Sequence, residues 1–160
     1  FMEQQRTSLL RSVANGLGAG LGATMIMSLV MVAGERLGLL GQHPPSKLSD
    51  RLLDRVTPFR SREETDAVGT MIHLGIGAGL GAAFALLRRL VPLFRIPGAG
   101  VAYALGVWAT SYAGLLPALK IMPMPGNDRP GRPPVMIAAH VVFGLALGLL
   151  TRRSARRLAR

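Results

Sequence analysis

The chain has 160 residues, which suits a single domain, and it is rich in hydrophobic residues (49%) and in glycine (20 residues). This composition excludes a disordered chain, and the absence of cysteine excludes disulfides, thiolate chemistry and cysteine-based metal sites. The net charge of +11 would suggest nucleic acid as a partner of a soluble protein, but here the charges lie between and beyond long uncharged runs.

Four uncharged runs follow one another along the chain. They cover residues 12–34, 68–87, 96–119 and 133–151 and are 23, 20, 24 and 19 residues long. A helix needs roughly 20 apolar residues to cross the hydrocarbon core of a bilayer. We therefore predict an all-α fold, a four-transmembrane-helix bundle that forms one integral membrane domain over residues 1–160. The helices are expected at about 12–34, 67–88, 96–119 and 134–151.

The connections between the runs differ in character. Between the first two runs, Leu48, Leu52 and Val56 recur every four residues among charged positions, which predicts an amphipathic helix at about 46–57 in the membrane interface. Residues 120–134 contain five prolines and two glycines, which predict a stiff surface strap. Residues 152–160 form a basic tail.

Small residues recur at helical spacing in three of the runs. In the second and fourth runs a histidine, His73 or His140, precedes two glycines by four and eight residues, so that all three lie on one helix face. Glycines at a spacing of four let helices approach closely in lipid. The helix-packing positions that we predict are Gly16, Gly20, Gly77, Gly81, Gly144 and Gly148.

The repeated phrase indicates an internal duplication. Each half has a glycine-rich span, a polar connection with a Pro-Pro pair, and a span that carries the histidine phrase. An even number of spans in each half predicts a parallel repeat, a tandem pair of helical hairpins related by an axis along the membrane normal. His73 and His140 should then lie at the same depth and near the same face.

Ionisable residues inside a membrane are rare, and function is the first hypothesis for them. His73 and His140 could relay protons, or they could serve as axial ligands of a haem or of a chlorophyll-type pigment. The ordinary alternative is a pair of neutral histidines that form hydrogen bonds between helices. No nucleophile–base pair, metal-ligand spacing or phosphate-binding loop is apparent, so we predict no metal site and no enzyme.

Basic residues are densest beside the helix ends on the side of the two termini. Ten of the nineteen lysines and arginines lie on that side, with Glu3 as its one acid. Because lysine and arginine are enriched in cytoplasmic segments, we expect both termini in the cytoplasm. Anionic lipid headgroups are the expected counterpart of the basic residues at the membrane surface: Arg88, Arg89, Arg152, Arg153, Arg156 and Arg157.

One family is similar to the C-terminal half of the chain. The order Trp108, Tyr112, Pro117, Met-Pro123-x-Pro125, Pro-Pro and His140-x-x-Phe-Gly144 resembles the small four-span bacterial inner-membrane proteins of the YagU-like group, mainly over residues 100–150. The resemblance implies a bacterial inner-membrane location and a link to acid tolerance. The chain departs from that group at Ser111 and Gly114, where a His-Glu type pair would be expected for a shared proton-linked role.

The sequence therefore predicts a non-catalytic accessory subunit that packs against other integral membrane proteins through its glycine-rich faces. A small proton-linked transporter or channel that uses His73 and His140 is the alternative, and a haem- or pigment-binding subunit is a further one. The expected partners are other membrane proteins and anionic lipids, with a homo-oligomer left open, and not nucleic acid, because few aromatic residues accompany the basic ones.

Overall fold

A computed structural model describes residues 2–40 and 62–158 of the chain, and this part is helical without any strand. The long helices are α1 (Met2–Arg36), α3 (Arg62–Leu90), α4 (Ala99–Thr110) and α6 (Arg132–Leu158). A π-helical turn, η2 (Ser111–Leu115), and the short helix α5 (Leu116–Ala118) continue α4. Two 3₁₀ turns, η1 (Pro92–Arg95) and η3 (Pro125–Asn127), lie in the connections.

Four segments of the described chain are long and apolar enough to cross a membrane: Thr7–Arg36, Asp66–Leu90, Ala99–Ala118 and Arg132–Arg153. The predicted all-α architecture with four membrane spans is confirmed. The helices extend beyond the uncharged runs at most ends, and α6 continues through the basic tail to Leu158. The amphipathic helix predicted at 46–57 lies outside the described residues.

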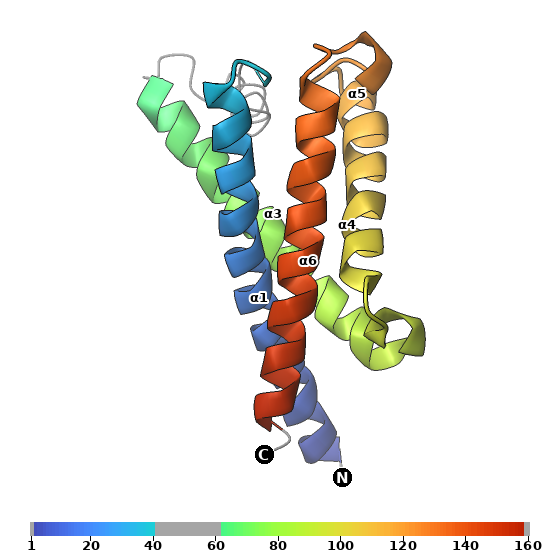
Figure 1. Cartoon of the computed structure of the whole chain (residues 1–160). Coiled ribbons are helices and arrows are strands. Elements are labelled where there is room, and N and C mark those ends of the chain that lie inside the picture. Colours follow the sequence, from blue (N-terminus) through green and yellow to red (C-terminus); the bar gives the residue numbers. More distant parts are fainter. Residues whose placement is uncertain (1, 41–61, 159–160) are drawn as a thin grey trace.

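The four helices do not surround a common axis evenly. Helices α1 and α6 pack against each other, α3 packs on α1, and α4 packs on α6 (Figure 1). Helices α3 and α4 meet only near the turn that joins them and diverge toward the end of the molecule opposite the two termini (Figure 1). The order α3–α1–α6–α4 therefore leaves a space between the two outer helices.

An aromatic cluster holds α3 and α4 together near their connecting turn. The ring of Phe84, which is fully buried, lies 5.1 Å from the ring of Tyr103 and 6.1 Å from that of Phe94. The hydroxyl group of Tyr103 on α4 donates a hydrogen bond of 3.0 Å to the carbonyl oxygen of Leu80 on α3. This end of the α3–α4 pair is thus closed by packing and by one hydrogen bond inside the membrane.

Helices α1 and α3 approach each other so closely that a side chain cannot fit between them. A Cβ atom added to Gly16 would lie 2.7 Å from the Cα of Ala82, and one added to Gly20 would collide with the carbonyl oxygen of Gly77. A Cβ atom on Gly81 would collide with the backbone of Gly16 and Gly20. Because the colliding atoms belong to the backbone, these glycines are required by the close approach.

The second half of the chain repeats this close contact at one of the two glycines that follow the histidine. Gly100 on α4 and Gly144 on α6 face each other, and a Cβ atom on Gly144 would lie 2.6 Å from the Cα of Val101. A Cβ atom on Gly148 would lie 4.0 Å from the Cα of Gly100, which is ordinary van der Waals distance. In both halves the glycine four residues after the histidine meets a glycine of the preceding span, in agreement with the predicted repeat.

This packing predicts opposite effects for two neighbouring glycines of α1. Gly20→Ala should lower the stability of the protein in detergent by about 1–3 kcal/mol, because the new methyl group meets the α3 backbone. Gly18→Ala is the matched control, since a Cβ atom there meets nothing within 4 Å and the helix propensity of alanine exceeds that of glycine. Unfolding followed by circular dichroism measures both; equal loss from the two variants would contradict the assigned contact.

Candidate functional site

A cavity of about 260 Å³ lies between α3 and the α4–η2–α5 segment, with α1 and α6 also contributing to its wall. Most of its lining is apolar and includes Met27, Met31 and Met136. Four polar side chains reach it, one from each of the four spans: Thr24, His73, Ser111 and His140. The two histidines of the repeated phrase are therefore brought to one site.

His140 is held in a defined orientation by its own helix. The residue is 8% exposed, and its Nδ1 atom lies 2.8 Å from the carbonyl oxygen of Met136. A carbonyl oxygen can only accept a hydrogen bond, so Nδ1 donates and carries the hydrogen of the neutral ring. The Nε2 atom is then a lone-pair acceptor, which can take a hydrogen bond or a proton.

The two hydroxyl groups of the cavity are directed to backbone carbonyls. Thr24, which packs over Gly77, donates to the carbonyl oxygen of Gly20 at 2.7 Å, and Ser111 donates to that of Val107 at 2.7 Å. Each hydroxyl oxygen keeps acceptor capacity, but its hydrogen is already used. Proton chemistry at this site would therefore depend on the two imidazole rings.

The cavity wall on the α4 side is shaped by a widened helical turn. In η2 the N–H group of Leu116 donates to the carbonyl oxygen of Ser111, a step of five residues instead of four. Pro117 follows directly; it has no N–H group, and its ring obstructs the carbonyl group four residues earlier. Such π turns are frequent at functional sites. This widening places Ser111 and Leu115 at the cavity.

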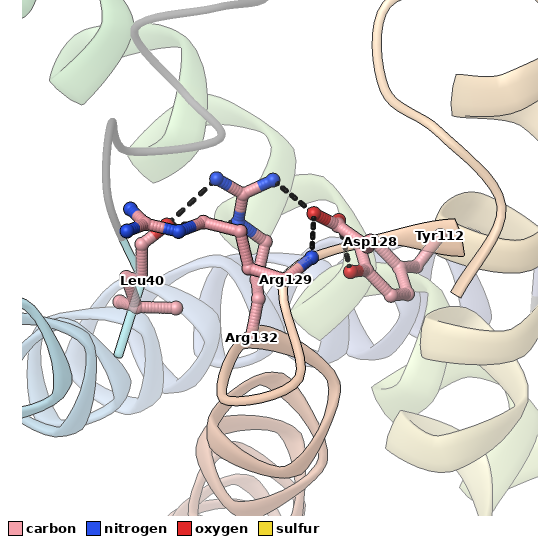
Figure 2. A network of polar contacts seen from close by, with 5 residues as sticks. All are labelled: Leu40, Tyr112, Asp128, Arg129 and Arg132. Atoms are coloured by element: carbon pink, nitrogen blue, oxygen red, sulfur yellow. Dashed lines mark hydrogen bonds and ion pairs between the residues drawn. The ribbon is translucent and has the colours of Figure 1, made fainter. Parts of the chain in front are cut away.

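A buried polar network crosses the end of the molecule opposite the termini (Figure 2). The Nη1 atom of Arg132 donates to Asp128 at 2.6 Å, and the side chains of this ion pair are 4% and 2% exposed. The Nε and Nη2 atoms of Arg132 both donate to the carbonyl oxygen of Leu40, at 2.9 and 2.7 Å. Tyr112, in the π turn, donates its hydroxyl hydrogen to the other carboxylate oxygen at 2.6 Å. The network therefore ties together the end of α1, the π turn and the start of α6.

The electrostatics of Asp128 follow from these contacts. Burial by itself would raise the pKa of the Asp128 carboxyl group. Hydrogen bonds from Tyr112, from the backbone N–H of Arg129 and from Arg132, together with the positive charge of Arg132, outweigh burial and lower the pKa below its ordinary value. Asp128 is thus a carboxylate at neutral pH, and the pair with Arg132 is fully charged.

The backbone at the end of α1 presents the carbonyl group of Leu40 to this network. Gly38 has a left-handed conformation (φ +72°), and the N–H of Leu39 donates to the carbonyl oxygen of Gly34 at 2.9 Å. This pattern is a Schellman motif, which ends a helix and turns the chain. The network was not predicted from the sequence. Two features pointed to it: the spacing of four residues between Asp128 and Arg132, and Tyr112, whose hydroxyl group needs a hydrogen-bond partner when it is buried.

The predicted surface arginines belong to the C-terminal ends of α3 and α6, and both ends lie in the half of the molecule that carries the termini (Figure 1). Arg88 and Arg89 belong to the last turn of α3, and Arg152, Arg153, Arg156 and Arg157 belong to the last turns of α6. Arg95 of η1 adds to this end and caps α3 by donating to the carbonyl oxygens of Arg88 and Arg89, both at 2.8 Å. Of the predicted basic residues whose side chains the structure describes, namely Arg88, Arg89, Arg152 and Arg153, none lines the cavity.

The model of a family described as "Family of unknown function (DUF6789)" matches residues 10–159. No curated protein and no solved structure matches the chain.

The polar network predicts which arginine is structural. Arg132→Gln should lower stability by about 3–5 kcal/mol, because it leaves the Asp128 carboxylate buried without its ion pair. Tyr112→Phe should cost about 1.5–3 kcal/mol through the loss of one hydrogen bond to a charged group. Arg129→Gln is the control, since Arg129 reaches Asp128 through its backbone. Chemical unfolding in detergent ranks the three variants; an Arg129 variant as unstable as the Arg132 variant would refute the assignment.

The lowered pKa of Asp128 also predicts a pH dependence. A carboxyl group with a lowered folded-state pKa stabilises the protein fully above its unfolded pKa, and that contribution is lost as the pH falls through the folded value. The ordinary value is 3.8. The stability difference between the wild type and Asp128→Asn should thus be constant from pH 7 to about pH 5 and narrow below about pH 4. A difference that narrows already near neutral pH would show that Asp128 is not held as a carboxylate.

Proposed function

The chain belongs to the DUF6789 family, whose function is unknown, and we propose that it is a small proton-linked transporter that uses His73 and His140. The observation that carries the proposal is that both intramembrane histidines line one cavity between α3 and α4. Two ionisable rings on a shared space inside a bilayer suit a proton-coupled binding site better than two separate hydrogen bonds between helices.

The character of the cavity favours a transporter over a channel. A channel needs a polar path, whereas this cavity has four polar side chains in an apolar lining, and two of these already donate to their own helices. At about 260 Å³ it is smaller than the sites of roughly 300–1,000 Å³ that hold drug-sized ligands. The solute that fits is therefore small and mostly apolar, and a macrocycle such as haem is disfavoured.

Binding of a proton and binding of the solute would each strengthen the other at this site. Protonation of His140 at Nε2 places a positive charge in an apolar cavity, which is costly unless the charge is paired or hydrogen-bonded. A solute with a negative charge or a strong hydrogen-bond acceptor offers that partner. We therefore expect a small weak acid or a similar acceptor-bearing solute to be bound with the proton.

The distribution of charge supports an orientation for this transporter. The end with both termini carries the arginine-rich ends of α3 and α6, and such ends face the cytoplasm in most membrane proteins. We place the protein in the bacterial inner membrane with both termini in the cytoplasm. The polar network of Arg132 and Asp128 then lies at the periplasmic end.

A second candidate is the accessory subunit that the sequence suggested. The predicted glycines Gly16, Gly20, Gly77 and Gly81 make contacts within the chain, so a partner would need other small residues. Gly75 and Gly79 on α3 offer such a surface, because both are exposed and a Cβ atom on either meets nothing within 4 Å. Native electrophoresis in mild detergent tests this candidate, and migration of the protein alone after gentle extraction would count against it.

Proton flux tests the transporter directly. In liposomes loaded with a pH-sensitive dye, the wild-type protein should collapse an imposed pH gradient faster than protein-free liposomes when a small monocarboxylate is present outside. The double variant His73→Gln, His140→Gln should fall to the protein-free rate, because glutamine can form hydrogen bonds but cannot carry a proton. His43→Gln, at a histidine outside the predicted spans, is the matched control. A double variant that keeps the wild-type rate would reject the role of the histidines.

A further inference from the structure

We propose that the protein binds an anionic phospholipid at its cytoplasmic end, with the acyl chain in a groove along α4 and the phosphate at Arg95 and Arg88. This site is separate from the cavity of the two histidines and does not depend on the transport proposal. It combines an apolar groove that opens outward with a cluster of guanidinium groups at the mouth of that groove.

The groove has a volume of about 540 Å³ and follows one face of α4 from η1 upward. Its lining is almost entirely apolar, from Leu93 and Ile96 beside η1 to Val107 and Thr110 on α4. Leu93 and Ile96 are 66% and 50% exposed, so the groove opens to the outside of the helix bundle. Gly106 lies in its floor, where a Cβ atom would meet nothing within 4 Å.

The length of the groove matches one leaflet of a membrane. Its lining on α4 runs from Gly98 to Thr110, and twelve steps of about 1.5 Å along a helix give roughly 18 Å. The hydrocarbon core is about 30 Å thick, so each leaflet contributes roughly 15 Å. A groove of this length beside the helix end can hold one acyl chain along its course.

Arg95 lies in η1, where the groove begins, and its side chain keeps binding capacity. The residues on either side of it, Phe94 and Ile96, both line the groove. Its Nε and Nη2 atoms each donate to a carbonyl oxygen at the end of α3, at 2.8 Å. A guanidinium group has five N–H donors in a planar fork, so three remain for a phosphate group.

Arg88 and Arg152 add positive charge beside Arg95. The guanidinium carbon of Arg88 lies 5.9 Å from the ring centre of Phe84, which packs against Phe94 and Tyr103 of the groove wall. Arg88 lies close enough to Arg152 and to Arg95 for its positive charge to be repelled by each of them. Among the side chains that the structure describes at this end, no carboxylate pairs with them. A bound anion would relieve the repulsion.

The two features together select a phospholipid over a soluble anion. A free phosphate ion would use the arginines but not the apolar groove, and a zwitterionic lipid would use the groove but add its own positive charge beside the guanidinium groups. Basic pockets at the cytoplasmic ends of membrane helices bind acidic headgroups in this manner. Phosphatidylglycerol satisfies both halves of the site.

Lipid binding to the full-length protein in detergent tests the site. In native mass spectrometry with equal phosphatidylglycerol and phosphatidylcholine, the wild type should retain the former. The double variant Arg88→Gln, Arg95→Gln should bind it about tenfold more weakly. Gly106→Leu should also weaken binding, because leucine fills the groove while all charges stay. Arg36→Gln combined with Arg129→Gln, which removes two positive charges from exposed positions away from the groove, is the charge-matched control.

Three results would overturn the proposal. The first is a wild type that shows no preference between the two lipids. The second is a double variant that keeps the preference. The third is competition by glycerol phosphate that is as strong as competition by the lipid. Glycerol phosphate has the headgroup charge without acyl chains, so this result would indicate a site for free anions. Circular dichroism verifies that each variant is folded. Because Arg95 caps α3, the arginine variant could fail to fold, and the Gly106→Leu variant then tests the site alone.

Discussion

The close glycine contact between α1 and α3 is the constraint on which the rest of the structure depends. In hydrocarbon, helices gain nothing by hiding apolar side chains from lipid, so they associate where their backbones can approach each other. Gly16 and Gly20 on α1 meet Gly77 and Gly81 on α3 in such an approach. This contact holds α3 against α1 and directs its upper half away from α4 (Figure 1).

The space that results is bounded by different chemistry at its two ends. At the end where η1 joins them, Phe84, Phe94 and Tyr103 pack α3 and α4 together. At the other end, Arg132 and Asp128 fix α6, the end of α1 and the π turn to one another, but no described residue of α3 takes part. Each half has a glycine contact between its two spans. The cavity with His73 and His140 lies between α3 of the first half and the α4–η2–α5 segment of the second.

Much of this arrangement can be predicted from the sequence, because it depends on solvent and on periodicity. Uncharged runs of about 20 residues specify spans, and the phrase shared by His73 and His140 indicates that both belong to equivalent helices. The partner of each glycine cannot be predicted in the same way. Gly20 and Gly18 look alike in the sequence, yet one meets a backbone and the other meets nothing within 4 Å. The bonds from Arg132 to Leu40 join residues that are 92 positions apart, which no local pattern reports. The π turn directly before Pro117 could not be predicted from the sequence either.

Distances between spin labels on α3 and α4 test the central claim, that these helices diverge within the membrane and enclose the histidines. The chain has no cysteine, so a pair of introduced cysteines labels it uniquely. In lipid nanodiscs, labels at Met71 and Ala118 should lie clearly farther apart than labels at Leu90 and Ala102. Equal separations at the two ends, as in a bundle of parallel neighbours, would contradict the cleft and the shared site within it.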